Sequence, residues 1–454
     1  MIASVTSPPP SRSRPALFLF RGIGFVKAGV RSDLGGNALW YTALQGAERV
    51  AAVIQTVLLS RLLGMHDYGV FGMVFATLGL VTSIAGLQAG LTATVFISRY
   101  LASDKAKVAG VIAMVDRFGI VAGVVLTVAL LPFYQPIARG LLHQAGYDSV
   151  VIVAILFVAA TIVSGIQDGI AQGFEAFRYI ARLKLMLAVV GLALVIPAAK
   201  YYSLAGVFVV LLGLLVVKFL FMAVKVQELK QAACIPRKGS PVSFMQIMVD
   251  FALPSMSVSF VFGWAMWSGL YLSSRGAAGF AAVAVINVGL QWRGPAQLFT
   301  ASLSNVAVPY FSRHLGTNDH ARAGQLRRRL LWSNSLLALL ATAPVAVAAP
   351  LIMPIYGSGF VGGAWPFALI VISVVPYALA NVYMQELVGG ARMWRQLWIQ
   401  LPFCVLLVGG FFLWVPRFGA LGYGGTLLIA NSLFLLIVIA LDRRSEWRQS
   451  PAEI

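Results

Sequence analysis

The sequence predicts an all-α integral membrane protein with about twelve transmembrane helices, in two parallel six-helix repeats related by an axis along the membrane normal. Hydrophobic residues make up 59% of the 454 residues and charged residues only 11%, with a mean hydropathy of +0.86. Soluble domains carry about 25% charged residues. Apolar runs of about eighteen residues or more, long enough to cross a bilayer as helices, recur along the chain. The third observation is an internal repeat.

Two short motifs return at nearly half the chain length. The sequence ISRYL at 97–101 is matched by FSRHL at 311–315, an offset of 214 residues, and each copy ends a long apolar run before a basic loop. Residues 204–206 and 420–422 open the last apolar run of each half, at an offset of 216. Similar offsets at matching places in the hydropathy pattern predict two copies of one membrane unit.

The apolar runs predict twelve spans in order along the chain. Several are longer than the ~20 residues that cross a bilayer, which indicates tilt or helix ends that project into water. The expected spans are 38–60, 68–97, 109–131, 149–173, 183–199, 204–224, 245–270, 279–308, 330–352, 362–388, 397–415 and 421–441.

These spans predict the domain organisation. Residues 34–230 form the first six-helix bundle and 244–442 the second, and a cytoplasmic linker at 231–243 joins them. Residues 1–33 are a basic cytoplasmic tail, and 443–454 a second cytoplasmic tail. Six spans in each copy bring both copies into the membrane in the same direction, as in many secondary transporters.

Lysine and arginine predict the orientation. If the N-terminus is cytoplasmic, the inside segments hold twenty-five of these residues and the outside loops five. Positive loops remain on the cytoplasmic side, so both termini are expected there. This asymmetry and attraction to anionic lipids also explain the net charge of +19 without nucleic acid, for which no motif is present.

The sequence contains no motif that indicates a metal site or a cofactor. Cys234 lies in a basic loop and Cys404 within an apolar run, so a disulfide is not expected. The four histidines lack ligand spacing, and no phosphate-binding loop or metalloprotease motif occurs. We therefore expect no cofactor and no metal.

Several motifs resemble those of bacterial polysaccharide flippases. They are Arg61-Leu62-Leu63-Gly64, Asp67-Tyr68-Gly69, Gly90-Leu91, Ser98-Arg99, the eighth span's end at 308–313 and the tenth span's exit at 389–392. This family belongs to the multidrug/oligosaccharidyl-lipid/polysaccharide transporter superfamily. One departure is the middle of the seventh span, 264–268, which lacks the carboxylate that many relatives carry there.

The resemblance implies a function in O-antigen (lipopolysaccharide) or exopolysaccharide biosynthesis. It implies an inner-membrane flippase, not an enzyme, that moves a polyprenyl-diphosphate-linked oligosaccharide from the cytoplasmic to the periplasmic face. The implied partners are this lipid-linked substrate, membrane lipids, and a polysaccharide polymerase and chain-length regulator.

Polar residues in the first span suggest part of a binding site. Tyr41, Gln45, Glu48 and Gln55 share one helical face, and Arg49 lies beside it near the centre. Charges within spans are costly, so they usually face a cavity or a partner. We expect Arg49 to contact the anionic head group, with an interhelical ion pair as the alternative.

The eighth span carries a second deep arginine. Gln291, Trp292 and Arg293 precede the pair Gly294-Pro295, and proline removes a backbone donor and kinks a helix. A guanidinium can bind a diphosphate through two parallel hydrogen bonds. We expect Arg293 to contact the head group; the alternative is a structural arginine bonded to carbonyls freed by the kink.

Other intramembrane residues complete the candidate set. Arg117 is a third cation for the cavity, and Trp267 and Trp292 lie deep enough to stack on sugar rings. Lys218 is expected to extend its ammonium to the interface. Asp168, Asp250 and Glu386 lie toward inner ends of spans, and we expect interfacial solvation or helix capping, with proton transfer during transport as the alternative.

Two other functions remain open. A cation-coupled multidrug exporter of the same superfamily should have a deep acidic site, for which Glu48 is the main support. A membrane glycan polymerase or ligase should have a sizeable outside loop for its catalytic groups, and the longest here is 132–149.

Overall fold

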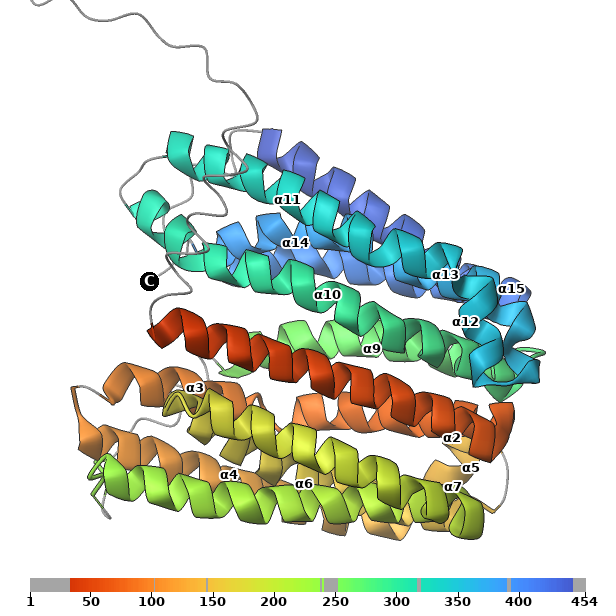
Figure 1. Ribbon diagram of the computed structural model, residues 1–454, viewed down its shortest axis with the longest axis horizontal. Helices are drawn as coiled ribbons and strands as arrows, with labels where there is room; N and C mark the ends of the chain where they lie inside the picture. Colours follow the sequence, from red (N-terminus) through yellow and green to blue (C-terminus); the bar gives the residue numbers. More distant parts are fainter. Residues whose placement is uncertain are drawn as a thin grey trace, which may run out of the picture.

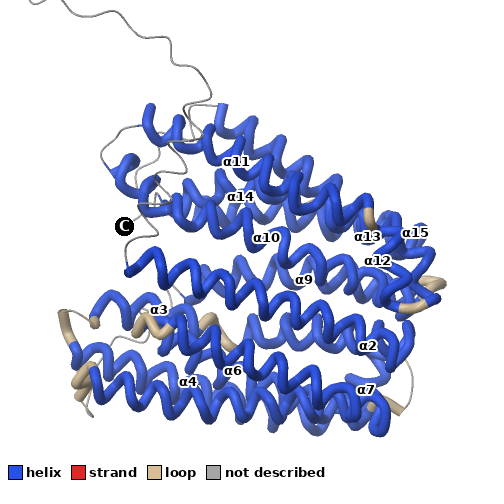
Figure 2. The backbone as a smooth tube through the Cα atoms, viewed as in Figure 1, coloured by secondary structure: helices blue, strands red, loops and turns tan. Residues whose placement is uncertain are grey.

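The computed structural model describes residues 33–101, 103–143, 146–236, 239–240, 252–316, 320–389 and 393–443. Throughout this part the chain consists of helices joined by turns (Figure 2). The expected tails before residue 33 and after residue 443, part of the linker, and Asp250 lie outside the described residues.

Thirteen α-helices and three 3-10 turns make up this part of the chain. Seven of its helical segments are long and apolar enough to cross a membrane. The helices are α2 Asp33–Ala85, α3 Ala89–Tyr100, α4 Lys105–Leu130, α5 Tyr134–Leu142, α6 Asp148–Gly173, α7 Phe177–Ala232, α9 Leu253–Arg275, α10 Gly279–Gly316, α11 His320–Val347, α12 Ala349–Ile352, α13 Ala364–Ile372, α14 Val374–Gly389 and α15 Met393–Arg443; the 3-10 turns are η1 Leu131–Phe133, η3 Met353–Tyr356 and η4 Ser358–Gly363.

Three of these helices each cover two predicted spans. α2, α7 and α15 contain one non-helical residue each, respectively Gly64, Ser203 and Gly419. Ser203 has φ 52° and ψ −149°, and Gly419 has φ 53° and ψ −127°. Positive φ favours glycine because it has no Cβ, so Ser203 adopts a strained conformation that Gly419 adopts easily. Each break separates two helical segments.

Element boundaries recur along the chain at an offset of 215 or 216 residues. The pairs are Lys105 and His320, Asp148 and Ala364, Phe177 and Met393 at helix starts, Gly173 and Gly389 at helix ends, and Ser203 and Gly419 at breaks. This spacing agrees with the offsets of the sequence motifs.

One predicted span departs from this regularity. The expected helix 68–97 is interrupted between α2 and α3, where Leu87 and Gln88 have φ values of 42° and 51°. A cavity of about 440 Å³ lies beside the interruption, between these elements and α6. α10 is helical through the equivalent region, 302–304, and also through Gly294-Pro295.

Glycines fix the position of α3. A Cβ at Gly90 or Gly169 would overlap the facing backbone, so the backbones of α3 and α6 are in direct contact. Thr94 Oγ1 also donates to the carbonyl oxygen of Gly169 at 3.0 Å. Small residues permit such close approach of helices in membranes. α3 is therefore held firmly against α6.

The helices run side by side along one direction (Figure 1). α2 lies in the middle, with α3 to α7 on one side and α9 to α15 on the other. We call α2–α7 the first half and α9–α15 the second half. α2 begins and α15 ends at one end of the bundle, which we call the terminal end; α12 lies at the opposite, far end.

Apolar side chains cover much of the surface. Val128 is 67% exposed, Leu340 64% and Val405 70%. Exposed patches of this kind are rare on soluble monomers, and here they lie on long apolar helices, as expected of surfaces that face lipid.

Candidate functional site

Arg49 lies where the two halves meet. It comes from α2 and is exposed, and a Cβ built on Gly294 of α10 would lie 3.7 Å from its Nη1. Among the described side chains, no carboxylate lies within 4 Å of Arg49. The alternative of an interhelical ion pair therefore has no support in this part of the chain.

The polar neighbours of Arg49 are only partly described. Glu48 is half-buried and makes no ion pair with a described side chain. The side chain of Gln45 lies outside the described ones. Gln291 is half-buried on α10, one helical turn from Gly294. Gln291 therefore lies on the face of α10 that approaches α2.

Arg293 is buried within the second half. Only 5% of it is exposed, and its guanidinium carbon lies 5.3 Å from the ring centroid of Tyr377 on α14. Its Nε is buried without a hydrogen-bond partner among the described residues. A buried arginine with no carboxylate partner among the described residues retains the capacity to bind an anion. Arg293 thus points from α10 into the second half, while Arg49 of α2 approaches the next residue of α10, Gly294.

Arg117 is separate from these two. It is exposed on α4, and no contact joins it to Arg49 or Arg293 among the described residues. The structure therefore brings together the regions of two of the three predicted arginines.

Both candidate tryptophans form hydrogen bonds through their indole N–H. Trp267 of α9 donates to Thr77 Oγ1 of α2 at 2.9 Å, and its ring stacks on Tyr271 with centroids 5.0 Å apart. Trp292 donates to Tyr356 Oη at 2.9 Å. Trp267 thus links the two halves, and Trp292 fixes the turn η3.

The turns η3 and η4 of the second half rest on α2 at the far end. Arg61 Nε donates to the carbonyl oxygen of Ile355 at 2.7 Å, and Ser60 Oγ to that of Tyr356 at 3.0 Å. Tyr356 is fully buried. A Cβ built on Gly359 would lie 3.7 Å from the Cβ of Met65. These contacts close the bundle between its halves at the far end.

Glycines on α2 continue this closure toward the middle. A Cβ at Gly69 would overlap the carbonyl oxygen of Phe280, and one at Gly72 would overlap the amide of Asn287. Both partners belong to α10. We call Gly69, Gly72, Phe280 and Asn287 the glycine seam. The close contact is possible because the two α2 residues have no side chain.

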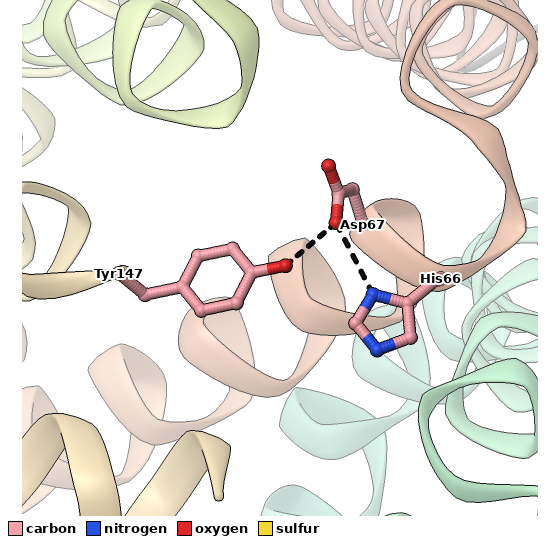
Figure 3. Close-up of polar contacts among 3 residues, drawn as sticks. All are labelled: His66, Asp67 and Tyr147. Carbon is pink, nitrogen blue, oxygen red and sulfur yellow. Dashed lines mark hydrogen bonds and ion pairs between the residues drawn. The ribbon is translucent and has the colours of Figure 1, made fainter. Parts of the chain in front are cut away.

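Polar groups around the far end include two residues after Gly64. Tyr147 Oη donates to Asp67 Oδ1 at 2.7 Å, and His66 Nδ1 lies 3.2 Å from the same oxygen (Figure 3). Burial and this carboxylate raise the pKa of Tyr147, so its hydroxyl stays a donor. The contact ties the start of α6 to α2.

His143 adds a titratable contact between the halves. It follows α5, and its ring centroid lies 5.9 Å from that of Tyr271, over which Arg275 lies at 5.2 Å. Burial and the Arg275 charge lower the pKa of His143 from its ordinary value. The neutral imidazole is therefore the form that suits the closed far end.

Charges near the terminal end form ion pairs that sequence reasoning missed. The expectation that Lys218 extends to the interface is wrong, because its Nζ lies 2.7 Å from Asp168 Oδ2. Glu386 binds Arg327 at 2.9 Å, and Arg327 also reaches Asp442 at 2.8 Å. Asp168 and Glu386 are 9% and 7% exposed, so neither is solvated at the interface as expected. These pairs join helices within each half.

Comparison with known proteins agrees with this architecture. The family model described as "Polysaccharide biosynthesis protein" matches residues 34–315, more than half of the chain. The "EPS I polysaccharide export inner membrane protein EpsE" of Ralstonia solanacearum is 22% identical over 399 residues, covering 84% of this chain and 86% of that protein.

Solved structures of transporters share the fold. An inward-facing multidrug resistance MATE family transporter of the MOP superfamily has a TM-score of 0.73 at 16% identity, covering 89% of this chain and 96% of that one. A MOP superfamily transporter from Pyrococcus furiosus has a TM-score of 0.69 at 15% identity, covering 93% of this chain and 98% of that one. An outward-facing MATE structure gives 0.67 at 15%, with the same coverage.

The helical architecture and its likenesses define a membrane protein with the fold of the MOP transporter superfamily. Within that class the family is settled by the match over residues 34–315. The chain belongs to the polysaccharide biosynthesis protein family, and the resemblance inferred from its motifs is confirmed.

Proposed function

We propose that this protein is a flippase of the bacterial inner membrane. It moves a polyprenyl-diphosphate-linked oligosaccharide from the cytoplasmic to the periplasmic face, for O-antigen or exopolysaccharide synthesis. The sugar-diphosphate head passes between the halves, and the lipid tail stays in the bilayer. The export function printed for the relative EpsE supports this direction.

The observation that carries the proposal is the placement of Arg49. A guanidinium at the meeting of two transporter halves, exposed and without a carboxylate among the described side chains, suits an anionic ligand. A diphosphate accepts two parallel hydrogen bonds from such a group. Arg293 offers a second positive charge on the same stretch of α10. Gln291 and Glu48 add polar groups near Arg49.

The distribution of contacts supports alternating access. The far end is closed by Arg61, Met65 and the glycine seam, whereas Arg49 is exposed nearer the terminal end. The higher TM-score to an inward-facing than to an outward-facing relative agrees with this state. In our proposal the terminal end faces the cytoplasm, and transport opens the far end as the halves rock.

The proposal includes twelve spans in two parallel repeats with bounds 34–230 and 244–442. Six pairs of corresponding positions at offsets of 215 or 216 support the duplication; the last pair is Gly64 and Gly279, which both have positive φ. Both termini are then cytoplasmic, and the polymerase and chain-length regulator act at the periplasmic face on the delivered units.

The test uses a strain that lacks the protein. We expect finished single lipid-linked units to accumulate facing the cytoplasm, and the intact gene to reverse this. Arg49→Gln should restore transport at least tenfold less well than wild type at equal protein level. Arg139→Gln, at an exposed arginine on α5, is the matched control and should restore it fully.

Other outcomes separate the alternatives. Units that reach the periplasmic face but are not joined would indicate a polymerase or ligase. Unchanged lipid-linked sugars together with drug resistance on overexpression would indicate the multidrug exporter, which the MATE likeness favours. Full transport by Arg49→Gln would refute the assignment of the site.

A further inference from the structure

A stripe of two polar residues and a glycine lies on the face of α10 that approaches α2. Asn287, Gln291 and Gly294 follow one another at intervals of four and three, so they share this face. Contacts fix both ends of the stripe: Asn287 lies against Gly72, and Gly294 against Arg49. Seven residues of helix separate the ends by roughly 10 Å.

Asn287 has an unused donor. Its Nδ2 is buried and has no acceptor among the described residues. Buried amides are normally paired, and an unpaired one costs roughly as much as a lost hydrogen bond. Gly72 leaves room for this amide, since any Cβ there would overlap it. The closed state therefore keeps a polar group where an apolar one would pack at lower cost.

Opening of the seam would give this donor access to an acceptor. If α2 separates from α10, Asn287 would border the passage that, in the proposed function, the oligosaccharide crosses. A carboxamide offers two donors and an acceptor, which matches a sugar hydroxyl that both donates and accepts. The carboxamide carries no charge to neutralise a diphosphate. That role falls to Arg49 of α2, which lies beside Gly294 at the other end of the stripe.

We propose that Asn287 is a specificity-determining residue that hydrogen-bonds a sugar hydroxyl of the substrate as the glycine seam opens. This inference rests on the proposed function and names the part of the substrate that this position recognises. A site that pairs with a substrate hydroxyl discriminates strongly against an analogue that lacks it, because its own polar group is then left unpaired.

The test compares two probes in liposomes that contain the purified full chain. One is polyprenyl diphosphate without sugar, and the other is the lipid-linked oligosaccharide extracted from the deletion strain. We expect wild type to prefer the glycosylated probe in kcat/KM. Asn287→Leu should reduce this preference at least tenfold, whereas Arg49→Gln should slow both probes alike. Asn431→Leu, at a buried asparagine of α15, is the control and should leave the preference unchanged.

Three outcomes decide the matter. A preference that survives Asn287→Leu overturns the inference, and so does an equal loss for both probes, which would indicate a purely structural role. Wild-type protein that moves neither probe would instead refute the proposed function. As a check on position, Gly72→Ala should block transport of both probes, and Gly72→Ala with Asn287→Ala should recover transport of the sugar-free probe without restoring the preference for the glycosylated one, because the second change removes the overlap but also the amide.

Discussion

Cysteines at Met65 and Gly359 should lock the far end closed. The Cβ of Met65 lies 3.7 Å from a Cβ built on Gly359, within the 3.5–4.5 Å range of natural disulfides. Met65 belongs to the first half and Gly359 to the second. If these halves must separate at the far end in each transport cycle, the oxidised double variant should lose at least nine-tenths of its transport, and a reductant should restore it.

The assay requires a background without native thiols, because Cys234 is exposed and Cys404 is buried. Both are replaced by serine, and a protease site is inserted in the 231–243 linker. After cleavage, the two fragments should stay joined on a non-reducing gel only in the oxidised variant. Transport is then measured on the same sample as the cross-linked fraction.

A disulfide within one half is the matched control. A Cβ built on Gly123 lies 3.4 Å from the Cβ of Ala159, 0.1 Å below the same range, and both residues belong to the first half. Gly123→Cys with Ala159→Cys should oxidise, as thiol titration would show, and leave transport unchanged. Wild-type transport by a fully cross-linked Met65–Gly359 pair would refute the reasoning, since the far end would then not open.

Three further changes have defined outcomes. Gly69→Ala should lower transport at least tenfold, because its methyl group would overlap the Phe280 carbonyl, whereas Gly79→Ala meets nothing within 4 Å and should be silent in the same assay. Arg327→Gln removes the charge that pairs with Glu386 and Asp442 and should cost on the order of 3 kcal/mol, seen as a lower midpoint of thermal inactivation; an unchanged midpoint would contradict the pairing. The lowered pKa of His143 means that the closed far end binds fewer protons than the open one, so closure is favoured at neutral pH and weakens as pH falls below ~6.5. Labelling of a far-end cysteine, divided by its labelling rate in the unfolded protein at the same pH to remove the change in thiolate fraction, should therefore increase in acid, and His143→Gln should abolish that dependence.

Hydropathy predicted the helix bounds closely where a span forms one uninterrupted helix. The expected span 149–173 corresponds to α6, Asp148–Gly173. The expected span 68–97 was wrong in its middle, because the chain turns at Leu87 and Gln88. Neither is a typical turn residue, and hydropathy does not record φ. The interruption depends on the close packing of α3 against α6, which is a tertiary contact.

The helix that carries each charged residue was predictable, but the direction of its side chain was not. Successive residues of a helix differ by about 100°. Gly294 can therefore face Arg49 while Arg293, one residue earlier, faces Tyr377. The pairing of Lys218 with Asp168 joins residues fifty positions apart on different helices, which local spacing cannot reveal. Asn287 was visible as a polar residue in the eighth span, but only the contact with Gly72 gives it a role.

We expect the interruption between α2 and α3 to make the two halves differ in stiffness. α3 shares backbone contact with α6, while the earlier part of the same span packs on α10 through the glycine seam. The two parts of the expected span 68–97 therefore pack against different helices, and they are joined at Leu87 and Gln88. The equivalent stretch of α10 is one continuous helix. We expect the first half to bend at Leu87 and Gln88 and the second half to move as a unit with α10. The two copies of the repeat would then move differently, although they share one fold.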